Sequence, residues 1–330
     1  MRNTRTIILA AGHGTRMVSD KPKVLHEVCG ETLVGHVIRA NHQAGIDDIA
    51  VIVGFQAERV ADHLPKDVRH YLQAEQLGTG HAVIQAMDFI KDFDGNVLIL
   101  MGDAPLIRPE TLNNMVTAHE EKGCSATVLT AFLDDPTGYG RMIKSGDDLI
   151  RIVEDKDATA EEKEIKEINS GMYCFNARDL ADSLSEIRPN NAQGEYYLTD
   201  VIEILRNQGK KVSTYASDDP EDLAAVNNKV QLAEVGAIMR KRINHRLMTA
   251  GAIMADPNTV YLSADTQVGK DTVIYPGVMT EGKVVIGANC VIGHNVRIVD
   301  SVIADGAVLH DVTMVNNAVV TKCRMPIPKF

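Results

Sequence analysis

The sequence contains no tryptophan, and only 4% of its 330 residues are aromatic. It has no run of the roughly 20 apolar residues that a membrane-spanning helix needs, since its longest apolar stretches cover only residues 6–12 and 96–101. Positive charge is also scarce, because 34 Lys and Arg stand against 45 Asp and Glu and give a formal net charge of −11. These shortages argue against a membrane protein and against a partner that is nucleic acid or an anionic membrane surface.

Cysteine is uncommon as well. The five cysteines lie far apart, are odd in number and form no C-x-x-C pair. This spacing indicates reduced thiols, argues against a zinc site or a disulfide framework, and favours a cytoplasmic protein. The apolar stretch near the N-terminus ends at Gly12 in a polar loop, so we interpret it as a first β-strand rather than a signal peptide.

The length suggests about two domains, at roughly 150 residues for each. In the first part of the chain, short apolar runs alternate with amphipathic segments. We expect strands at residues 6–10, 49–53, 96–101, 125–132 and 170–175, and helices at residues 33–44, 80–89 and 109–121. This alternation predicts an α/β fold with a mainly parallel sheet, in which ligands bind beyond the carboxyl ends of the strands.

The pattern changes near residue 230. Residues 230–249 carry apolar side chains at steps of three and four, with cations toward the end, which predicts a single helix that ends at Gly251. We therefore expect an α/β domain at residues 1–229, a linker helix at residues 230–250 and a second domain at residues 251–330.

The second domain contains an internal repeat of six residues. One mostly aliphatic slot recurs at every sixth residue from Val268 to Ile298, and after a five-residue step the series resumes from Ile303 to Val315. This period predicts a short parallel β-helix of roughly four coils, each made of three short strands. Its narrow core has little room for large side chains, which explains the scarce aromatics. The alternative, an antiparallel β-sandwich, would alternate with a period of two.

A candidate phosphate-binding loop follows the first strand. Residues 9–17 read LAAGHGTRM, and Lys23 comes soon after, in a Lys-Pro-Lys sequence. Small residues and two glycines let backbone N–H groups approach a phosphate, while Arg16 and Lys23 add cationic donors. The loop is not a Walker A motif, which needs Gly-Lys-Ser/Thr, and Met17 stands where a Rossmann fingerprint would have its third glycine.

This loop resembles the signature of sugar-nucleotide pyrophosphorylases, and further segments match that family in order. They are residues 73–82 (QAEQLGTGHA), 101–106 (MGDAPL), 134–141 (DDPTGYGR), 153–158 (VEDKDA), 167–171 (EINSG) and 191–200 (NAQGEYYLTD). Together they resemble the GlmU family of bifunctional N-acetylglucosamine-1-phosphate uridyltransferases and glucosamine-1-phosphate acetyltransferases. The likeness covers essentially residues 5–310.

The resemblance implies a Rossmann-like nucleotidyltransferase domain, followed by a linker helix and a short left-handed parallel β-helix of hexapeptide repeats. It also implies Mg²⁺-dependent uridyl transfer from UTP to N-acetylglucosamine 1-phosphate, which supplies UDP-N-acetylglucosamine for cell-wall precursors. A homotrimer formed through the β-helix is expected.

Residue chemistry and the resemblance together give the candidate site. The attacking sugar phosphate is already an anion, so the reaction needs cations and Mg²⁺ rather than a general base, and we assign Arg16 and Lys23 as catalytic. Asp103 follows the strand at residues 96–101, where a carboxylate suits Mg²⁺, although a turn or capping role explains it equally well without the resemblance. The resemblance adds Asn227 as a second metal ligand. It also assigns nucleotide binding to Leu9, Ala10, Ala11, Gly12, Gln73, Gly78, Thr79, Met101 and Gly102, and sugar-phosphate binding to Gly140, Glu154 and Asn169.

Two alternatives stay open at this point. A pyrophosphorylase for another sugar 1-phosphate would share these motifs, and a non-catalytic scaffold could keep the fold, although Arg16, Lys23 and Asp103 argue against a scaffold. The six-residue pattern fades after Val320, so we expect acetyltransferase activity to be absent. The coil histidines His294 and His310 are expected at exposed loop or edge positions.

Overall fold

A computed structural model describes residues 3–146, 148–191 and 193–321 of the chain. The chain divides into two compact units, one formed by Met1–His26 with Leu33–Lys229 and the other by Glu27–Thr32 with Val230–Phe330. Residues 322–330 belong to the predicted second domain but lie outside the described residues. No helix in the described part of the chain is both long and apolar enough to cross a membrane.

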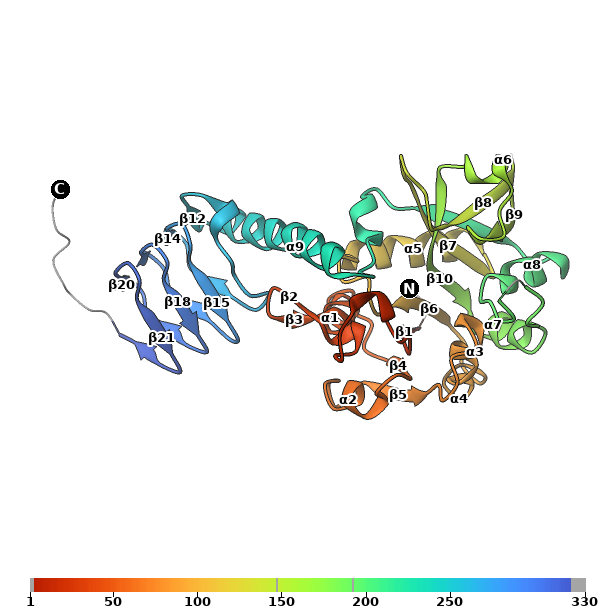
Figure 1. The fold of residues 1–330 in the computed structure, drawn as a ribbon, viewed down its shortest axis with the longest axis horizontal. Helices are drawn as coiled ribbons and strands as arrows, with labels where there is room; N and C mark the ends of the chain where they lie inside the picture. Colours follow the sequence, from red (N-terminus) through yellow and green to blue (C-terminus); the bar gives the residue numbers. More distant parts are fainter. Residues whose placement is uncertain (1–2, 147, 192, 322–330) are drawn as a thin grey trace. The chain divides into compact units, whose positions relative to one another are not determined.

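The first unit is built on one mixed sheet (Figure 1). Its strand order is β11-β7-β10-β6-β1-β4-β5, and β8 pairs with β10 and with β9. The strands of the sheet are β1 (Thr4–Ala10), β4 (Ile49–Val53), β5 (Arg69–Leu72), β6 (Asn96–Met101), β7 (Ala126–Phe132), β8 (Gly140–Ser145), β9 (Asp148–Val153), β10 (Glu167–Asn176) and β11 (Val212–Ala216). All five predicted strands are present.

The strands β6, β1, β4 and β5 are parallel to one another, as are β7 and β11. The expectation of a mainly parallel sheet is correct for these strands and wrong at β10, which runs antiparallel to β6, to β7 and to β8. A β8–β9 antiparallel ribbon extends from β10. The hydrophobic pattern of a buried strand does not encode its direction, so the reversal could not be read from residues 170–175.

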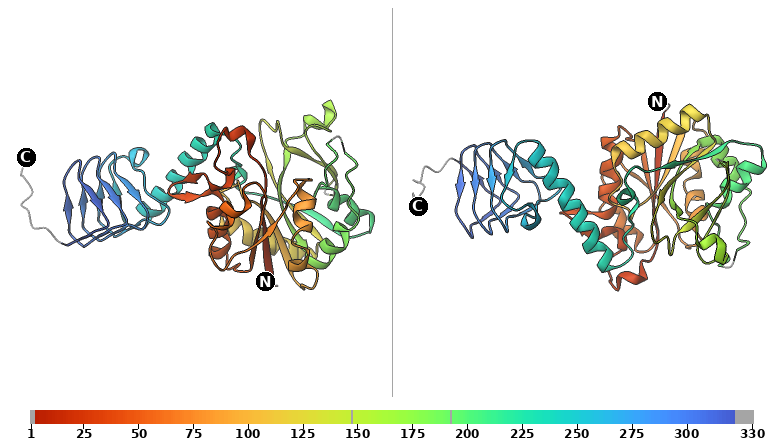
Figure 2. Two further views of the ribbon diagram at one scale, coloured as in Figure 1. Left: turned by 60° about the horizontal axis from the view of Figure 1, so that its bottom comes forward. Right: turned by 90° about the horizontal axis from the view of Figure 1, so that it is seen from above.

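Helices cover both faces of this sheet (Figure 2). Ile7 and Leu9 of β1 pack with the core under α3, α4, α7 and α8, whereas Ile8 and Ala10 pack with α1 and α5 on the other face. Alternate side chains of a strand point to opposite faces, so a strand covered on both sides is apolar throughout. The helices of this unit are α1 (Leu33–Gln43), α2 (Ala57–Ala61), α3 (Thr79–Ile84), α4 (Met87–Ile90), α5 (Pro109–Lys122), α6 (Ala160–Lys163), α7 (Ala177–Leu184) and α8 (Asp200–Asn207), with the 3-10 turns η1 (Thr15–Met17), η2 (Lys23–Leu25) and η3 (Pro220–Leu223).

The helix predicted at residues 80–89 is wrong in one respect, because the chain forms two short helices there. Ala86, at φ −99° and ψ 22°, separates α3 from α4 and donates its N–H to the carbonyl of Val83 at 3.0 Å. The break turns Phe89 and Ile90 onto the sheet, where both are buried. Packing of two large side chains thus outweighs continuation of a regular helix.

The second unit contains α9 (Lys229–Thr249) and a stack of short strands. The predicted helix at residues 230–249 is confirmed. It ends at Thr249, two residues before Gly251, whose φ of +108° suits glycine. The N–H of Ala252 caps the carbonyl of Leu247 at 3.1 Å. The strands are β12 (Ile253–Met254), β13 (Gln267–Val268), β14 (Val273–Ile274), β15 (Met279–Glu281), β16 (Val285–Ile286), β17 (Val291–Ile292), β18 (Arg297–Val299), β19 (Val302–Ile303), β20 (Val308–Leu309), β21 (Met314–Asn316) and β22 (Val319–Val320), with the 3-10 turn η4 (Pro257–Thr259).

These strands form a left-handed parallel β-helix whose coils stack in Figure 2. They make three parallel sheets, ordered β12-β14-β17-β20, β13-β16-β19-β22 and β15-β18-β21. Val273 pairs with Val291, 18 residues later, and Val291 pairs with Val308, 17 residues later, because one step of the repeat has five residues. Parallel pairing at this spacing excludes the β-sandwich. The predicted inward slot is buried at Ile274, Thr280, Ile286, Ile292, Ile298, Ile303, Leu309 and Val315.

A short hairpin of β2 (Glu27–Val28) and β3 (Glu31–Thr32) belongs to the second unit although its flanking segments belong to the first. Cys29 at its tip has a φ of +50°, and its carbonyl accepts the N–H of Ala264 at 2.8 Å. Burial raises the pKa of the Cys29 thiol to about 11, which nearby Arg240 only partly opposes. This hairpin was not predicted from the sequence.

Candidate active site

The signature loop leaves the sheet where β1 ends at Ala10. A Cβ placed on Gly12 would meet no other part of the protein within 4 Å, so this backbone is open to a ligand. Gly14 has a φ of +61°, and a Cβ there would lie only 2.6 Å from the Cβ of Lys23. Glycine is therefore needed at residue 14 for the loop to fold back against Lys23.

Four polar side chains from separate segments converge next to this loop. The ammonium group of Lys23 forms a close ion pair with Oδ2 of Asp103, and it also lies 3.3 Å from Oδ1 of Asn227. Arg16 donates from Nη2 to the same Oδ1 at 2.9 Å. The N–H of Val226 donates to the carbonyl of Asp103 at 2.8 Å, which holds the Asn227 segment beside the end of β6. The structure thus brings together both predicted catalytic cations and both predicted metal ligands.

One carboxylate oxygen of this cluster is open to a magnesium ion, whereas Oδ1 of Asn227 accepts from Arg16 and Lys23. Oδ1 of Asp103 is buried and has no hydrogen-bond partner among the described residues, although Lys23 already pairs with Oδ2, so Oδ1 is the atom that a divalent cation could bind. Mg²⁺ prefers oxygen ligands and takes one or two from the protein, with the rest from phosphates and water. In the described part of the chain, no group of three or more His, Cys, Asp or Glu could hold a metal, so a zinc-like centre does not compete with this assignment.

A pocket opens from the cluster along the carboxyl ends of β1, β5 and β6. Gln73, which follows β5, is buried, and its Nε2 donates to the carbonyl of Gly78 at 3.1 Å. Gly78 has a φ of +107°, and a Cβ there would lie 2.6 Å from the carbonyl oxygen of Tyr196. The hydroxyl of Thr79 accepts the N–H of Leu198 at 3.1 Å. The pocket measures about 240 Å³ and is lined by Leu9, Ala10, Ala11, Gly12, Lys23, Val24, Gln73, Gln76, Gly78, Thr79, Ala82, Met101, Asp103 and Glu195.

Gly102 is the one predicted nucleotide-binding residue that does not line this pocket. Its N–H donates to the carbonyl of Leu9 at 2.9 Å, and a Cβ there would lie 3.0 Å from that oxygen. Gly102 therefore holds the start of the Asp103 turn against the end of β1.

The three predicted sugar-phosphate residues form a second group on neighbouring strands. Gly140 of β8 pairs with Asn169 of β10. The amide of Asn169 is used at both ends, because Nδ2 donates to the hydroxyl of Tyr173 at 2.9 Å and Oδ1 accepts the N–H of Gly171 at 3.0 Å. Glu154 follows β9. Its pKa is raised mainly by burial and further by the nearby carboxylates of three aspartates.

Two observations place residues next to this group, Tyr139 beside Gly140 and Gly171 near Asn169, close to the metal cluster and the pocket. Burial raises the pKa of the Tyr139 hydroxyl, and the negative charge of Asp103 raises it further, so Tyr139 lies near Asp103. A Cβ placed on Gly171 would lie 3.5 Å from Sδ of Met101, which lines the pocket. The predicted site residues thus occupy one continuous region of the first unit.

Comparison with known proteins agrees with this geometry. Residues 5–230 match the Nucleotidyl transferase family, and residues 265–300 match the bacterial transferase hexapeptide (six repeats) family. "Bifunctional protein GlmU" of Alkaliphilus metalliredigens is 48% identical over 316 residues, which cover 96% of this chain and 69% of that protein. The chain belongs to the GlmU family of nucleotidyltransferases. It is an enzyme of this class.

Two further GlmU relatives are similar to the chain over most of its length, and one solved structure shares the fold. The GlmU proteins of Clostridioides difficile and Limosilactobacillus reuteri are 47% and 48% identical, and the matches cover 69% and 68% of their lengths and 96% and 93% of this chain. A crystal structure from Bacillus anthracis, named for glucose-1-phosphate thymidylyltransferase activity and solved with sucrose, has a TM-score of 0.59. It is 21% identical and covers 71% of this chain and 94% of that one, which supports the fold alone.

Some residues of this GlmU-family site were missed by the sequence analysis. Val24, Gln76, Ala82 and Glu195 line the pocket without having been named. Gln76, Ala82 and Glu195 lie inside the matched segments at residues 73–82 and 191–200, so membership of those segments was the available signal. Tyr139, which lies near Asp103, also falls in a matched segment.

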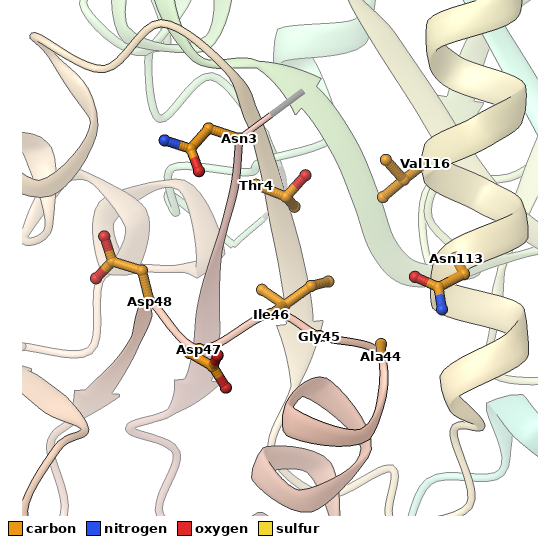
Figure 3. A pocket seen from close by; sticks show the side chains of 9 residues that line it. All are labelled: Asn3, Thr4, Ala44, Gly45, Ile46, Asp47, Asp48, Asn113 and Val116. Carbon is orange, nitrogen blue, oxygen red and sulfur yellow. The ribbon is translucent and has the colours of Figure 1, made fainter. Parts of the chain in front are cut away.

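A larger pocket of about 420 Å³ lies away from this site, where β1 begins (Figure 3). Figure 3 shows Asp47 and Asp48 on the segment before β4, Asn3 at the start of β1, and Asn113 on α5. Both carboxylates already contact basic side chains. Ligands of parallel α/β sheets bind at the carboxyl ends of the strands, and this pocket lies at the opposite end, so we assign it no catalytic role.

Proposed function

We propose that the chain catalyses Mg²⁺-dependent uridyl transfer from UTP to N-acetylglucosamine 1-phosphate. The products are pyrophosphate and UDP-N-acetylglucosamine, a precursor of peptidoglycan and lipopolysaccharide. The observation that carries the proposal is the convergence of Arg16, Lys23, Asp103 and Asn227 at the mouth of the pocket, with one buried carboxylate oxygen unpartnered among the described residues.

Residues of this chain can stabilise the negative charge that the reaction brings together. A sugar phosphate must approach a triphosphate, so two polyanions repel each other and negative charge grows on the leaving pyrophosphate. Arg16 and Lys23 share the acceptor Oδ1 of Asn227, so two cations and the one carboxylate of Asp103 leave a local excess of positive charge in an otherwise acidic protein. Backbone N–H groups from Leu9 to Gly12 would hold the triphosphate, since the loop is open there.

Asp103 would hold the magnesium ion through Oδ1, and Asn227 would join it once its Oδ1 is released by Arg16 and Lys23. The ion, when bound, would neutralise phosphate charge and stabilise the leaving group. Asp103 forms an ion pair with Lys23, so Lys23 also fixes the orientation of that carboxylate.

Base recognition follows from the geometry of Gln73. Because its amide nitrogen donates to the carbonyl of Gly78, its amide oxygen is the atom that remains to accept the imide N–H of uracil. On the sugar side, Gly140 permits close backbone approach, while Glu154 and Asn169 offer a carboxyl group and an amide to the hydroxyl and acetamido groups.

The test is a steady-state assay of pyrophosphate release from UTP and N-acetylglucosamine 1-phosphate, with Mg²⁺ or with EDTA. Asp103→Ala should abolish the Mg²⁺-dependent rate and leave the fold intact. Asp47→Ala, which removes an exposed carboxylate from the opposite end of the sheet, should leave the rate unchanged. Full activity of Asp103→Ala would refute the metal assignment.

The two alternatives predict different results in the same assay. A panel that includes glucose 1-phosphate, mannose 1-phosphate and the other nucleoside triphosphates would give a higher kcat/KM for another pair if the substrate assignment is wrong. A chain without turnover on any pair would be a scaffold instead.

We further propose a domain division, a cellular location and a homotrimeric assembly for this chain. We keep the division into a nucleotidyltransferase domain at residues 1–229, a linker helix at 230–250 and a β-helix at 251–330, except that the hairpin at residues 27–32 belongs with the second unit. We also propose a cytoplasmic location, where UTP and sugar phosphates are available. A homotrimer is supported by an exposed apolar column on one β-helix sheet, formed in register by Val285, Val302 and Val319. Light scattering that finds a stable monomer would refute the trimer.

Acetyl transfer lies outside this proposal. His294 and His310 are exposed, as expected, and Nδ1 of His294 lies 3.3 Å from Asp311. The expectation that the chain lacks acetyltransferase activity stays a prediction. Release of free CoA thiol from acetyl-CoA and glucosamine 1-phosphate would contradict it.

A further inference from the structure

Asp222 carries a fully buried carboxylate that the proposed reaction does not use. Nε of Arg108 donates to its two oxygens at 2.7 and 3.0 Å. The hydroxyl of Thr111 donates to Oδ2 in a short hydrogen bond, and the hydroxyl of Ser217 lies 3.4 Å from the same oxygen. Removing a carboxylate from water is costly, so these bonds together must offset the loss of hydration.

The partners of Asp222 connect the two segments that carry the proposed metal ligands. Arg108 lies five residues after Asp103, and Asn227 lies five residues after Asp222. The far ends of the two segments are joined by the Arg108–Asp222 ion pair, and the near ends by the hydrogen bond from the N–H of Val226 to the carbonyl of Asp103. The segments therefore form a closed ring that is bridged at both ends.

A purely structural role is the competing explanation. Thr111 lies in the first turn of α5, and a carboxylate near a helix N-terminus stabilises the helix through its dipole. That role accounts for the burial of Asp222. It predicts only a loss of folding stability on substitution, and no specific change in the geometry of Asp103 or Asn227.

We propose that Asp222 is a positioning residue that sets the spacing of Asp103 and Asn227 for the divalent cation, a role that rests on the function proposed above. Groups that hydrogen-bond to metal ligands change the metal affinity by about 10- to 100-fold when they are substituted. Asp222 acts one bond further away, through Arg108 and the backbone, so the lower end of this range applies. Asp222→Asn keeps the shape of the side chain and loses the charge that holds Arg108. The affinity of the Asp222→Asn variant for the cation should therefore fall by about tenfold or more.

The experiment measures Mn²⁺ binding by electron paramagnetic resonance, with the full chain in molar excess over UTP and with a blank that contains UTP alone. A second measurement determines UTP affinity in EDTA, and circular dichroism and thermal melting establish that each variant is folded. Asp179→Asn is the matched control, because Asp179 is also a poorly exposed carboxylate paired with a cation, Lys210 at 2.9 Å, and it lies on α7. Thr111→Val, which removes one donor to Asp222, is a milder second variant if Asp222→Asn does not fold.

The expected result is at least tenfold weaker Mn²⁺ binding by Asp222→Asn, a smaller loss for Thr111→Val, and metal-free UTP affinity within twofold of the unaltered chain. Asp179→Asn should change only the melting temperature. The inference is overturned if a folded Asp222→Asn or Thr111→Val variant binds Mn²⁺ as tightly as the unaltered chain. If the unaltered chain with UTP binds no Mn²⁺, the proposed function itself fails and the inference fails with it.

Discussion

Replacing Gly12 with alanine adds a methyl group that meets no atom of the protein within 4 Å, apart from its chain neighbours. The φ of Gly12 is also not in the left-handed region, so alanine can adopt this backbone without strain. Because an alanine restricts the unfolded chain more than a glycine does, the variant should be as stable as the unaltered chain or more stable by about 0.4–1 kcal/mol.

Binding of UTP should become weaker in this variant if the phosphates of UTP lie against this backbone. The new methyl group would occupy the space through which the N–H of the loop reaches a phosphate oxygen. Losing one hydrogen bond to a charged group costs about 1.5–3 kcal/mol. With about 1.4 kcal/mol for each tenfold change, the KM for UTP should rise by roughly 10- to 150-fold.

The assay combines differential scanning fluorimetry with steady-state kinetics at varied UTP. Gly236→Ala is the matched control, because Gly236 lies in α9, has an ordinary φ, and likewise leaves a methyl group added there with no neighbouring atom within 4 Å. It should stabilise the helix by about 0.5–1 kcal/mol and leave KM unchanged. A Gly12→Ala variant that is folded and keeps the KM for UTP within twofold would refute the assignment of this loop to the triphosphate.

Three further predictions concern stability and nucleotide binding. Thr280→Val removes a buried hydroxyl that accepts the N–H of Ser263 at 2.8 Å, so the second unit should lose about 1–3 kcal/mol of stability, which denaturant unfolding would measure and an unchanged midpoint would contradict. Burial raises the pKa of Asp200 from 3.8 to about 6, so its contribution to stability is complete below pH 4 and lost as the pH rises through 6. Asp200→Asn should therefore flatten the dependence of the melting temperature on pH between 4 and 7, and an equally steep profile would exclude this cause. Gly78→Ala places a methyl group 2.6 Å from the carbonyl of Tyr196 at a φ of +107°, so it should lower both stability and UTP affinity, unlike Gly12→Ala; an effect on affinity alone would argue against the clash.

The features that could be predicted from the sequence are those in which one side-chain pattern has one structural solution. The strands at residues 49–53 and 96–101 agree with β4 and β6 at both ends, because a strand buried on two faces must be apolar throughout. The repeat of the second domain was also predicted across its single five-residue step. Ile298 and Ile303, which stand on either side of that step, are both buried in the structure.

Other features depend on partners that are distant in the sequence. The residues that line the pocket converge because several strands end at one edge, and the resemblance supplied that grouping for Gln73 and Asn227 where their own chemistry did not. Asp222 shows no local signal, since Thr111 and Arg108 lie more than a hundred residues before it. Tertiary packing also decided the break between α3 and α4, which helical periodicity could not reveal.

The hairpin at residues 27–32 has a practical consequence for dissecting the protein. It lies only four residues after Lys23 in sequence, yet its tip is bonded to Ala264 and its fold belongs with Val230–Phe330. A protease cut or gene truncation at residue 229 would therefore split one of the two units rather than separate them. The shortened product would expose Cys29, which otherwise packs against the core of the second unit.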